Sequence, residues 1–368
     1  MSPESTRIPF VDLALQNAPI LDEALARVRR VIEHGHYILG PEVGELECAL
    51  AGYLGVDHVV GVGNGTDALV LALRAHGIGE GDEVILPSHT FLASAAAICL
   101  VGARPVFADI DPETMLLSPS CAEERIGPQT RAIMPVHLNG FPCDMPAFIS
   151  LAERHDLVLI EDAAQSLGAC RDGRKTGSFG TGCFSLHPLK VMGACGDAGF
   201  VSTSDEALAE QIRQGRNLGL RNRDEAAGIA GNSRLDTLQA AILLAKLPRL
   251  EDWISARNAH ARRYRAGLEG LVTLPPEAPG VRPIDSPFVI RMETGRDRLQ
   301  KRLDEAGIDS KVHYPIPVHR QQPYRAFHDA PLPETERLVT EILSLPCSPE
   351  LSAEQCDRVI DVIQQELG

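Results

Sequence analysis

The chain has few aromatic residues, no excess of positive charge and no long apolar run. Aromatic residues make up 4% of the sequence, which disfavours a stacking surface for single-stranded nucleic acid. The formal net charge of −15 disfavours nucleic acids and anionic membranes as partners, because both attract clusters of Lys and Arg. No apolar stretch reaches the roughly 20 residues of a membrane span. We therefore expect neither a nucleic-acid partner nor a membrane partner.

Paired cysteine motifs are also missing. The nine cysteines include no CxxC pair, and their odd number does not suit a disulfide framework or a structural zinc site. His187, His313 and His319 do not form an H-E-x-x-H array, so we predict no metal site. Residues 1–5 do not start a basic region followed by an apolar one, so we expect no signal peptide and a cytoplasmic location.

Short apolar segments alternate with helical patterns through the first two thirds of the chain. Alternation of this kind predicts an α/β fold with a mostly parallel sheet covered by helices on both faces. The predicted strands are 58–62, 83–87, 105–108, 131–136, 157–161, 182–186 and 199–203, and the helices between them are 66–76, 90–101, 119–126 and 145–155.

The flanking regions predict an irregular arm and a second domain. The arm covers 1–20, and helices at 21–34, 41–54 and 235–247 complete a large domain of residues 1–247. A break at 248–253 begins a smaller α+β domain of residues 248–368. Its predicted helices are 251–269, 296–306, 334–343 and 352–367, and its predicted strands are 286–291 and 309–313.

A single lysine, Lys190, lies in a Gly-rich turn between two predicted strands, and Asp162 ends another. Ligands of parallel sheets bind at the carboxyl ends of the strands, so the two side chains can meet there. An amine facing a carboxylate is what a pyridoxal phosphate enzyme needs: the lysine forms the imine, and the carboxylate keeps the pyridine nitrogen protonated. Taken singly, each residue is more often a surface charge or a helix start.

Residues 61–69, Gly-Val-Gly-Asn-Gly-Thr-Asp-Ala-Leu, follow a predicted strand and open a helix. Glycines let the backbone approach an anion, and the first helical amides with the Thr66 hydroxyl could bind it. The alternative is a tight turn in which Thr66 or Asp67 caps the helix. The pattern is neither GxGxxG nor a Walker loop, which disfavours a dinucleotide or ATP site.

Two further residues follow strands. His89 could lie flat on a planar cofactor ring, or it could be a helix-start residue without a ligand. Gln165, three positions after Asp162, could donate to a phenolic oxygen of the cofactor, or it could be a buried amide.

Together these segments resemble the DegT/DnrJ/StrS family of pyridoxal phosphate-dependent aminotransferases, which act on keto-sugars that are usually nucleotide-linked. The resemblance covers nearly the full length, and it is specific through the combination of its motifs. They are 36–41 (His-Tyr-Ile-Leu-Gly-Pro), 63–69, 161–169 (Glu-Asp-Ala-Ala-Gln-Ser-Leu-Gly-Ala), 184–190 (Phe-Ser-Leu-His-Pro-Leu-Lys), 232–241 (Asn-Ser-Arg-Leu-Asp-Thr-Leu-Gln-Ala-Ala) and 313–317 (His-Tyr-Pro-Ile-Pro).

The resemblance implies a type I aminotransferase fold and a homodimer with shared active sites. It also implies the site roles. Lys190 would be the imine lysine, Asp162 the partner of the pyridine nitrogen, His89 the stacking residue and Gln165 the donor to the phenolic oxygen. The phosphate would be held by Gly65, Thr66, Asp67 and Ser185, and by Asn232 from the other subunit; Tyr314, Arg234 and His313 would face the substrate.

The implied reaction transfers an amino group from L-glutamate or L-glutamine to a keto-sugar. Three alternatives remain: an acceptor that is a free keto-sugar acid, a sugar dehydratase on the same scaffold, and a non-catalytic regulatory homologue. The dehydratases typically carry His in place of the lysine, whereas Lys190 is present. Two departures from the family pattern leave the sugar contacts open: Asp197-Ala198 stands where many members have Glu-Gly, and Asn139 stands where an aromatic residue is common.

Overall fold

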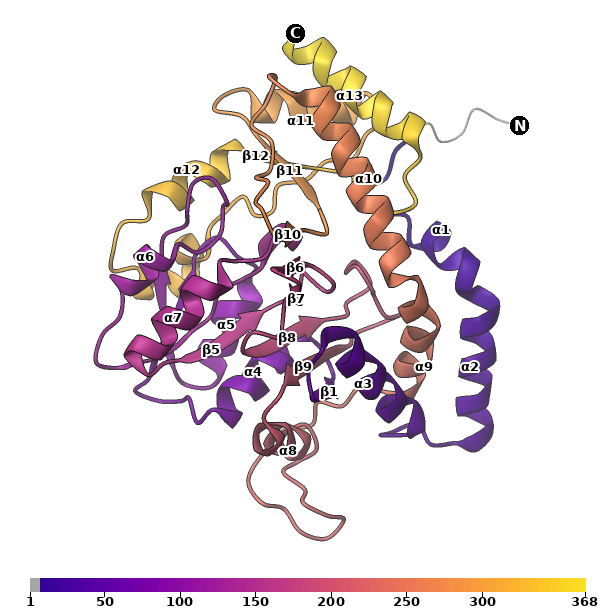
Figure 1. Cartoon of the computed structure of the whole chain (residues 1–368), viewed down its shortest axis with the longest axis vertical. Coiled ribbons are helices and arrows are strands. Elements are labelled where there is room, and N and C mark those ends of the chain that lie inside the picture. The colour runs from indigo at the N-terminus through magenta and orange to yellow at the C-terminus, as the bar shows by residue number, and fades with distance from the viewer. Residues whose placement is uncertain (1–6) are drawn as a thin grey trace.

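A computed structural model describes residues 7–368, and its centre is a seven-stranded sheet (Figure 1). The strand order is β1-β9-β8-β5-β4-β2-β3. The bounds are β1 His58–Val62, β2 Glu83–Pro87, β3 Arg104–Ala108, β4 Thr130–Ile133, β5 Val158–Asp162, β8 Thr181–Ser185 and β9 Gly199–Thr203. All seven strands predicted for this region are therefore present.

Four of the six strand pairings are parallel, and only β9 runs antiparallel to its neighbours β1 and β8. Helices connect most of the parallel strands, and residues 163–180, which contain no helix, connect β5 to β8. These helices are α4 Gly65–Ala75, α5 Leu92–Leu100, α6 Pro119–Glu123 and α7 Met145–His155, and α8 Glu206–Gly215 follows β9. The mostly parallel α/β prediction is confirmed.

Apolar side chains cover both faces of the sheet because they alternate along each strand. Val84 and Leu86 pack with α4 and α5 on one face, while Ile85 between them packs with α7 on the other. A third apolar cluster joins the sheet to α3 Pro41–Leu54 and α9 Thr237–Lys246. Both faces are thus buried, and a ligand has access at the strand ends.

The N-terminal region is more regular than predicted. The part of the expected irregular arm that the structure describes contains α1 Leu13–Asn17 and the short 3-10 helix η1 Ala18–Ile20; residues 1–6 lie outside the described residues. Asp12 caps α1 by accepting from the Leu15 N–H at 2.9 Å. Helix α2 Leu21–His34 then runs along the edge of the molecule beside α9 (Figure 1).

The C-terminal third has its own apolar core, centred on Tyr264 and Phe288. Its elements are η3 Leu247–Arg249, α10 Leu250–Leu268, β11 Phe288–Arg291, α11 Arg296–Glu305, η4 Val318–Arg320, η5 Gln322–Phe327, α12 Pro333–Glu341, β12 Ile342–Leu345 and α13 Ala353–Leu367. A small sheet of β10 Val281–Arg282, β6 Cys170–Arg171 and β7 Arg174–Lys175 lies outside this core.

Two predictions in this third are wrong. Residues 309–313 form no strand and make only an isolated bridge between Lys311 and Ser344. The helix expected over 334–343 ends at Glu341, because Ile342–Leu345 leave it to form β12 against β11.

The chain returns to the large sheet before it ends. The Val318 N–H donates to the Ser88 carbonyl at 3.0 Å, and Ser88 Oγ lies 2.6 Å from His319 Nδ1. Further on, Thr335 donates to Asp109 through its backbone N–H and its hydroxyl. The boundary at 247/248 stays a prediction, and these contacts tie residues 318–335 to the first of the two expected domains.

Candidate active site

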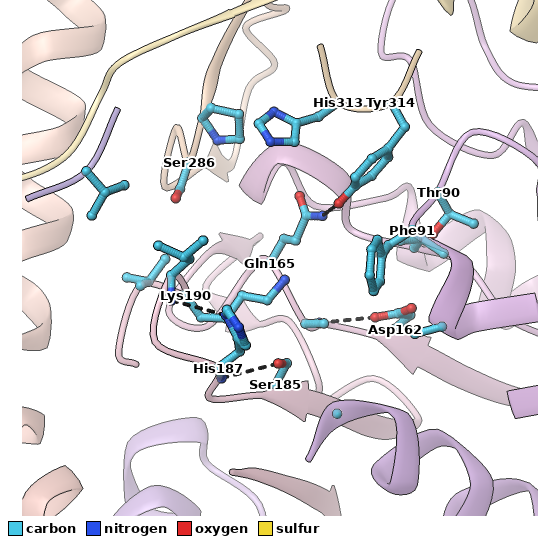
Figure 2. Close-up of a pocket in the computed structure, with 18 of the residues that line it drawn as sticks. Thr90, Phe91, Asp162, Gln165, Ser185, His187, Lys190, Ser286, His313 and Tyr314 are labelled. Atoms are coloured by element: carbon cyan, nitrogen blue, oxygen red, sulfur yellow. Dashed lines mark hydrogen bonds between the residues drawn. The ribbon is translucent and has the colours of Figure 1, made fainter. Parts of the chain in front are cut away.

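A cavity of about 810 Å³ lies at the carboxyl ends of the central strands. Residues that follow β1, β2, β5 and β8 line one wall. The opposite wall comes from the N-terminal residues Phe10 and Val11 and from segments around 286, 311 and 347. Figure 2 shows Lys190 and Asp162 on the sheet side, with His313 and Tyr314 approaching from the other.

Lys190 reaches the cavity from a tight turn after β8. Its backbone N–H donates to the His187 carbonyl at 2.8 Å, and the Ala194 N–H donates to Leu186 at 2.7 Å. A Cβ at Gly193 would collide with the Pro188 carbonyl, so the turn requires glycine there. Desolvation lowers the pKa of the Lys190 amine, while the Asp162 carboxylate opposes this effect. The lowered pKa favours the neutral, nucleophilic amine.

Asp162 ends β5 and is buried, with one edge on the cavity. Its Oδ2 accepts from Ser94 Oγ at 2.7 Å, and its Oδ1 accepts from the Ala164 N–H at 3.2 Å. Both hydrogen bonds hold the carboxylate in place at the edge of the cavity. The side chain can therefore hold a proton on a ring nitrogen bound in front of it.

Gln165 is oriented by a backbone contact. Its Oε1 accepts from the Asn139 N–H at 2.9 Å, which leaves its amide nitrogen to donate to the Tyr314 hydroxyl at 3.1 Å. Burial, assisted by Asp162 and opposed by Gln165, raises the pKa of Tyr314 to about 12, so the phenol is protonated at neutral pH. Gln165 and Tyr314 thus form a neutral donor pair facing the cavity.

The loop after β1 forms a cradle for an anion. Asn64, rather than Thr66 or Asp67, caps α4, because its Oδ1 accepts from the Asp67 N–H at 2.9 Å. Gly65 and Thr66 therefore present the helix N-terminus to the cavity together with Ser185. A Cβ on Gly65 would come within 2.6 Å of the Ser185 Cβ, so glycine keeps the cradle open. These groups fit a phosphate.

The placement of His89 corrects its predicted stacking role. His89 is 1% exposed, does not line the cavity, and lies with its Nε2 3.0 Å from the His313 carbonyl. Burial lowers its pKa to about 4, so the neutral ring donates to that carbonyl. Phe91, two residues on, is 52% exposed and lines the cavity, where its ring centroid is 5.6 Å from that of Tyr314. The presence of Phe91 in the same segment could have indicated which of the two side chains reaches the cavity.

Of the three residues predicted to face the substrate, two line the cavity and one does not. Tyr314 and His313 line the cavity, and burial lowers the pKa of His313 to about 4. Arg234 instead donates to Asn217 Oδ1 at 3.3 Å and does not line the cavity of this chain. Asn232 is exposed and also lies off the cavity, so its contact with a cofactor in the other subunit stays a prediction.

Sequence reasoning missed several residues of the wall opposite the sheet. Phe10, Arg257, Lys311 and Ser348 line the cavity, yet none belongs to a motif that the sequence analysis used. Residues 7–11 reach it because the Ile8 N–H donates to the Gly307 carbonyl at 2.7 Å and the Asp309 N–H donates to Ile8 at 2.9 Å. Such long-range pairing leaves no local pattern.

One group of potential metal ligands occurs in residues 7–368, away from the cavity. It consists of His319, His328 and Glu336. Glu336 is already paired with Arg320 and with His319 Nε2, the latter at 3.2 Å. These contacts account for the carboxylate without an ion.

With this geometry in view, comparison with known proteins identifies the family. The model of the DegT/DnrJ/EryC1/StrS aminotransferase family matches residues 19–364. The chain belongs to this family. It is 44% identical to the dTDP-3-amino-3,4,6-trideoxy-alpha-D-glucose transaminase of Streptomyces venezuelae, over 98% of this chain and 97% of that protein. It is 43% identical to a UDP-N-acetyl-3-dehydro-alpha-D-glucosamine 3-aminotransferase of Acidithiobacillus ferrooxidans, over 99% of both chains.

Solved structures give the same result. The crystal structure of S. venezuelae DesV in complex with a ketimine intermediate matches with a TM-score of 0.96 and 43% identity, over 99% of both chains. The type I aminotransferase fold, the aminotransferase activity on sugars and the pyridoxal phosphate cofactor predicted from the sequence are confirmed. The cradle at Gly65, the carboxylate of Asp162 and the amine of Lys190 fit this cofactor at its phosphate, its ring nitrogen and its carbonyl carbon.

Proposed function

We propose that this aminotransferase moves an amino group from L-glutamate or L-glutamine to a nucleotide-linked keto-sugar. The observation that carries the proposal is the half-buried Lys190 amine, which shares one cavity with the Asp162 carboxylate and an anion cradle. The nucleotide link is supported by the dTDP- and UDP-sugar substrates in the names of the two relatives. A volume of about 810 Å³ can hold the cofactor together with a substrate of drug size.

Pyridoxal phosphate, when bound, supplies a reactive carbonyl and an electron-accepting ring. Lys190 would carry the proton between the donor's α-carbon and the cofactor in each half of the reaction. Asp162 would keep a proton on the ring nitrogen, and Thr66, Ser185 and the first amides of α4 would hold the phosphate. Gln165 and Tyr314 would donate to the ring's phenolic oxygen, and Phe91 would cover the ring face.

The first test measures the visible absorption of purified holoenzyme before and after addition of L-glutamate or L-glutamine. Loss of the cofactor's visible band, with formation of the corresponding keto acid, would establish the donor half-reaction. dTDP- and UDP-linked keto-sugars would then be compared with free keto-sugar acids as acceptors. A band that neither donor changes would contradict the proposal and favour the regulatory alternative, while loss of a sugar hydroxyl without amino transfer would favour the dehydratase.

A homodimer and a cytoplasmic location complete the proposal. Leu21, Leu25 and Ile32 on α2, together with Tyr37 and Ile38, are large apolar side chains between 45% and 57% exposed. Such an apolar surface is typical of a protein interface. We expect light scattering to give twice the chain mass, and Leu25→Glu with Ile32→Glu to give monomers; monomeric wild type would contradict the dimer. Nine free cysteines among the described residues support a reducing compartment.

A further inference from the structure

Arg257 is a buried cation on the wall of the active-site cavity. It lies in the middle of α10, is 3% exposed, and lines the cavity beside Ser286 and Ser348. Its Nη1 donates to the Cys347 carbonyl at 2.8 Å, and its Nε has no hydrogen-bond partner. Among residues 7–368, no carboxylate lies within ion-pair distance of this guanidinium.

A buried charge with one carbonyl acceptor is energetically costly. Burial lowers the pKa of Arg257, and Cys347 and the carboxylate of Glu350 oppose this effect without reaching hydrogen-bond contact. The guanidinium remains protonated at neutral pH because its ordinary pKa is so high. Its charge therefore lacks a directly bonded counter-anion within the described chain.

Besides Glu350, which makes no hydrogen bond to Arg257, neither Cys347 nor Asp309 supplies that anion. Cys347 is buried, which raises the pKa of its thiol and keeps it neutral. Asp309 lines the same cavity, but its oxygens accept from Arg7 Nε at 2.8 Å and from the Phe10 N–H at 3.2 Å. Lys311 adds a second positive charge to this wall, with its Nζ 5.0 Å from the Phe10 ring centroid.

We propose that Arg257, assisted by Lys311, is a carboxylate-binding residue of the cavity, and that its ligand is a carboxylate of the amino donor. This inference rests on the proposed function, since it concerns the donor of that reaction. A guanidinium matches a carboxylate through paired N–H groups. The cofactor's phosphate already has a cradle at the N-terminus of α4, on the sheet side of the cavity.

The test measures the binding of glutarate, a dicarboxylate without an amino group, to holoenzyme by isothermal titration calorimetry. Arg257→Met should weaken glutarate binding at least about tenfold, the effect of losing a charged hydrogen bond. Arg257→Lys should fall between this variant and the wild type. Arg263→Met is the matched control on the same helix, because Arg263 is exposed and pairs with Asp357 at 2.5 Å; its glutarate affinity should equal that of the wild type.

A second titration with dTDP and UDP separates the two sources of an oxyanion. Their affinity should be unchanged in Arg257→Met if the ligand is the donor carboxylate; a loss for the nucleotides alone would assign Arg257 to the acceptor's phosphates and overturn the proposal. Unchanged glutarate affinity in a folded Arg257→Met or Arg257→Lys variant, checked by circular dichroism, would also overturn it, as would no glutarate binding to the wild type. Glutarate binding needs no turnover. If glutamate failed to convert the cofactor to its amino form, that result would therefore contradict the proposed reaction without contradicting the role of Arg257.

Discussion

The two walls of the cavity are built in different ways. The sheet wall carries Lys190, Asp162 and the Gly65 loop, each placed at the end of a strand or within a few residues after it. The opposite wall carries Phe10, Arg257 and Lys311, which come from distant parts of the chain. The sheet wall fits the cofactor, and the opposite wall faces the space left for substrates. A rigid sheet edge thus suits the constant chemistry, and a wall assembled from distant segments suits the variable ligand.

The largest expected effect comes from breaking the sheet wall at its lysine. Lys190→Ala should abolish both amino transfer and stable attachment of the cofactor, because the other lysine that lines the cavity in the described chain, Lys311, lies on the opposite wall. Lys301→Ala, an exposed change on α11, should leave both unchanged. Absorption spectra and keto acid formation measure the two quantities, and substantial turnover by Lys190→Ala would falsify the assignment.

Asp162→Asn should lower the rate by about a hundredfold to a thousandfold, as expected when a charge that stabilises the transition state is removed. The same change should also shift the pKa of Lys190 in a definite direction. Asp162 raises the pKa of Lys190 against the effect of burial, so its removal should lower that pKa further. The rate of cofactor attachment as a function of pH reports this pKa; a midpoint displaced to higher pH would contradict the electrostatic coupling.

Asp285, next to Ser286 on the substrate wall, should be a source of instability. Burial is the main cause that raises its pKa to about 6, so its charge is costly above that pH. Asp285→Asn should therefore raise the free energy of unfolding by about 1–3 kcal/mol at neutral pH, with the gain declining below pH 6 and absent below the ordinary carboxyl pKa of about 4. Asn suits the positive φ of 43° at this position. Urea unfolding at pH 4 and pH 8 measures the difference; equal gains at both would exclude the charge as its cause.

The smallest expected effect distinguishes Phe91 from His89. Phe91→Ala should weaken cofactor retention by about 1 kcal/mol, the typical value of an aromatic contact. His89→Gln should instead lower the melting temperature with less change in cofactor affinity, because His89 is bonded to the His313 carbonyl away from the cavity. Dialysis against cofactor-free buffer and thermal unfolding compare the two variants, and the reverse pattern would restore the stacking role to His89.

Sequence reasoning reached the sheet wall because short-range signals define it. The apolar strands that carry Asp162 and Ser185 at their ends can be recognised within a few residues, and so can the Gly-rich loop before Thr66. The stacking role was assigned to His89 because that residue follows a strand. Phe91 follows the same strand, β2, and the relative exposure of the two side chains depends on what packs above them. Ile342 was assigned to a helix because its apolar pattern continues that of α12, whereas its partner β11 lies some fifty residues away. Pairing between distant segments, including that of Ile8 with Gly307, is set by tertiary packing and leaves no local pattern.

The return of residues 318–335 to the large sheet has a mechanical consequence. Tyr314 is carried on a stretch of chain anchored at both ends: Lys311 pairs with β12 on one side, and Ser88 holds His319 on the other. A hinge rotation that separated the two walls would stretch this span or break the Ser88 contacts. Because both ends of this span are held, the Tyr314 hydroxyl keeps a fixed position in the cavity, 3.1 Å from the Gln165 amide nitrogen.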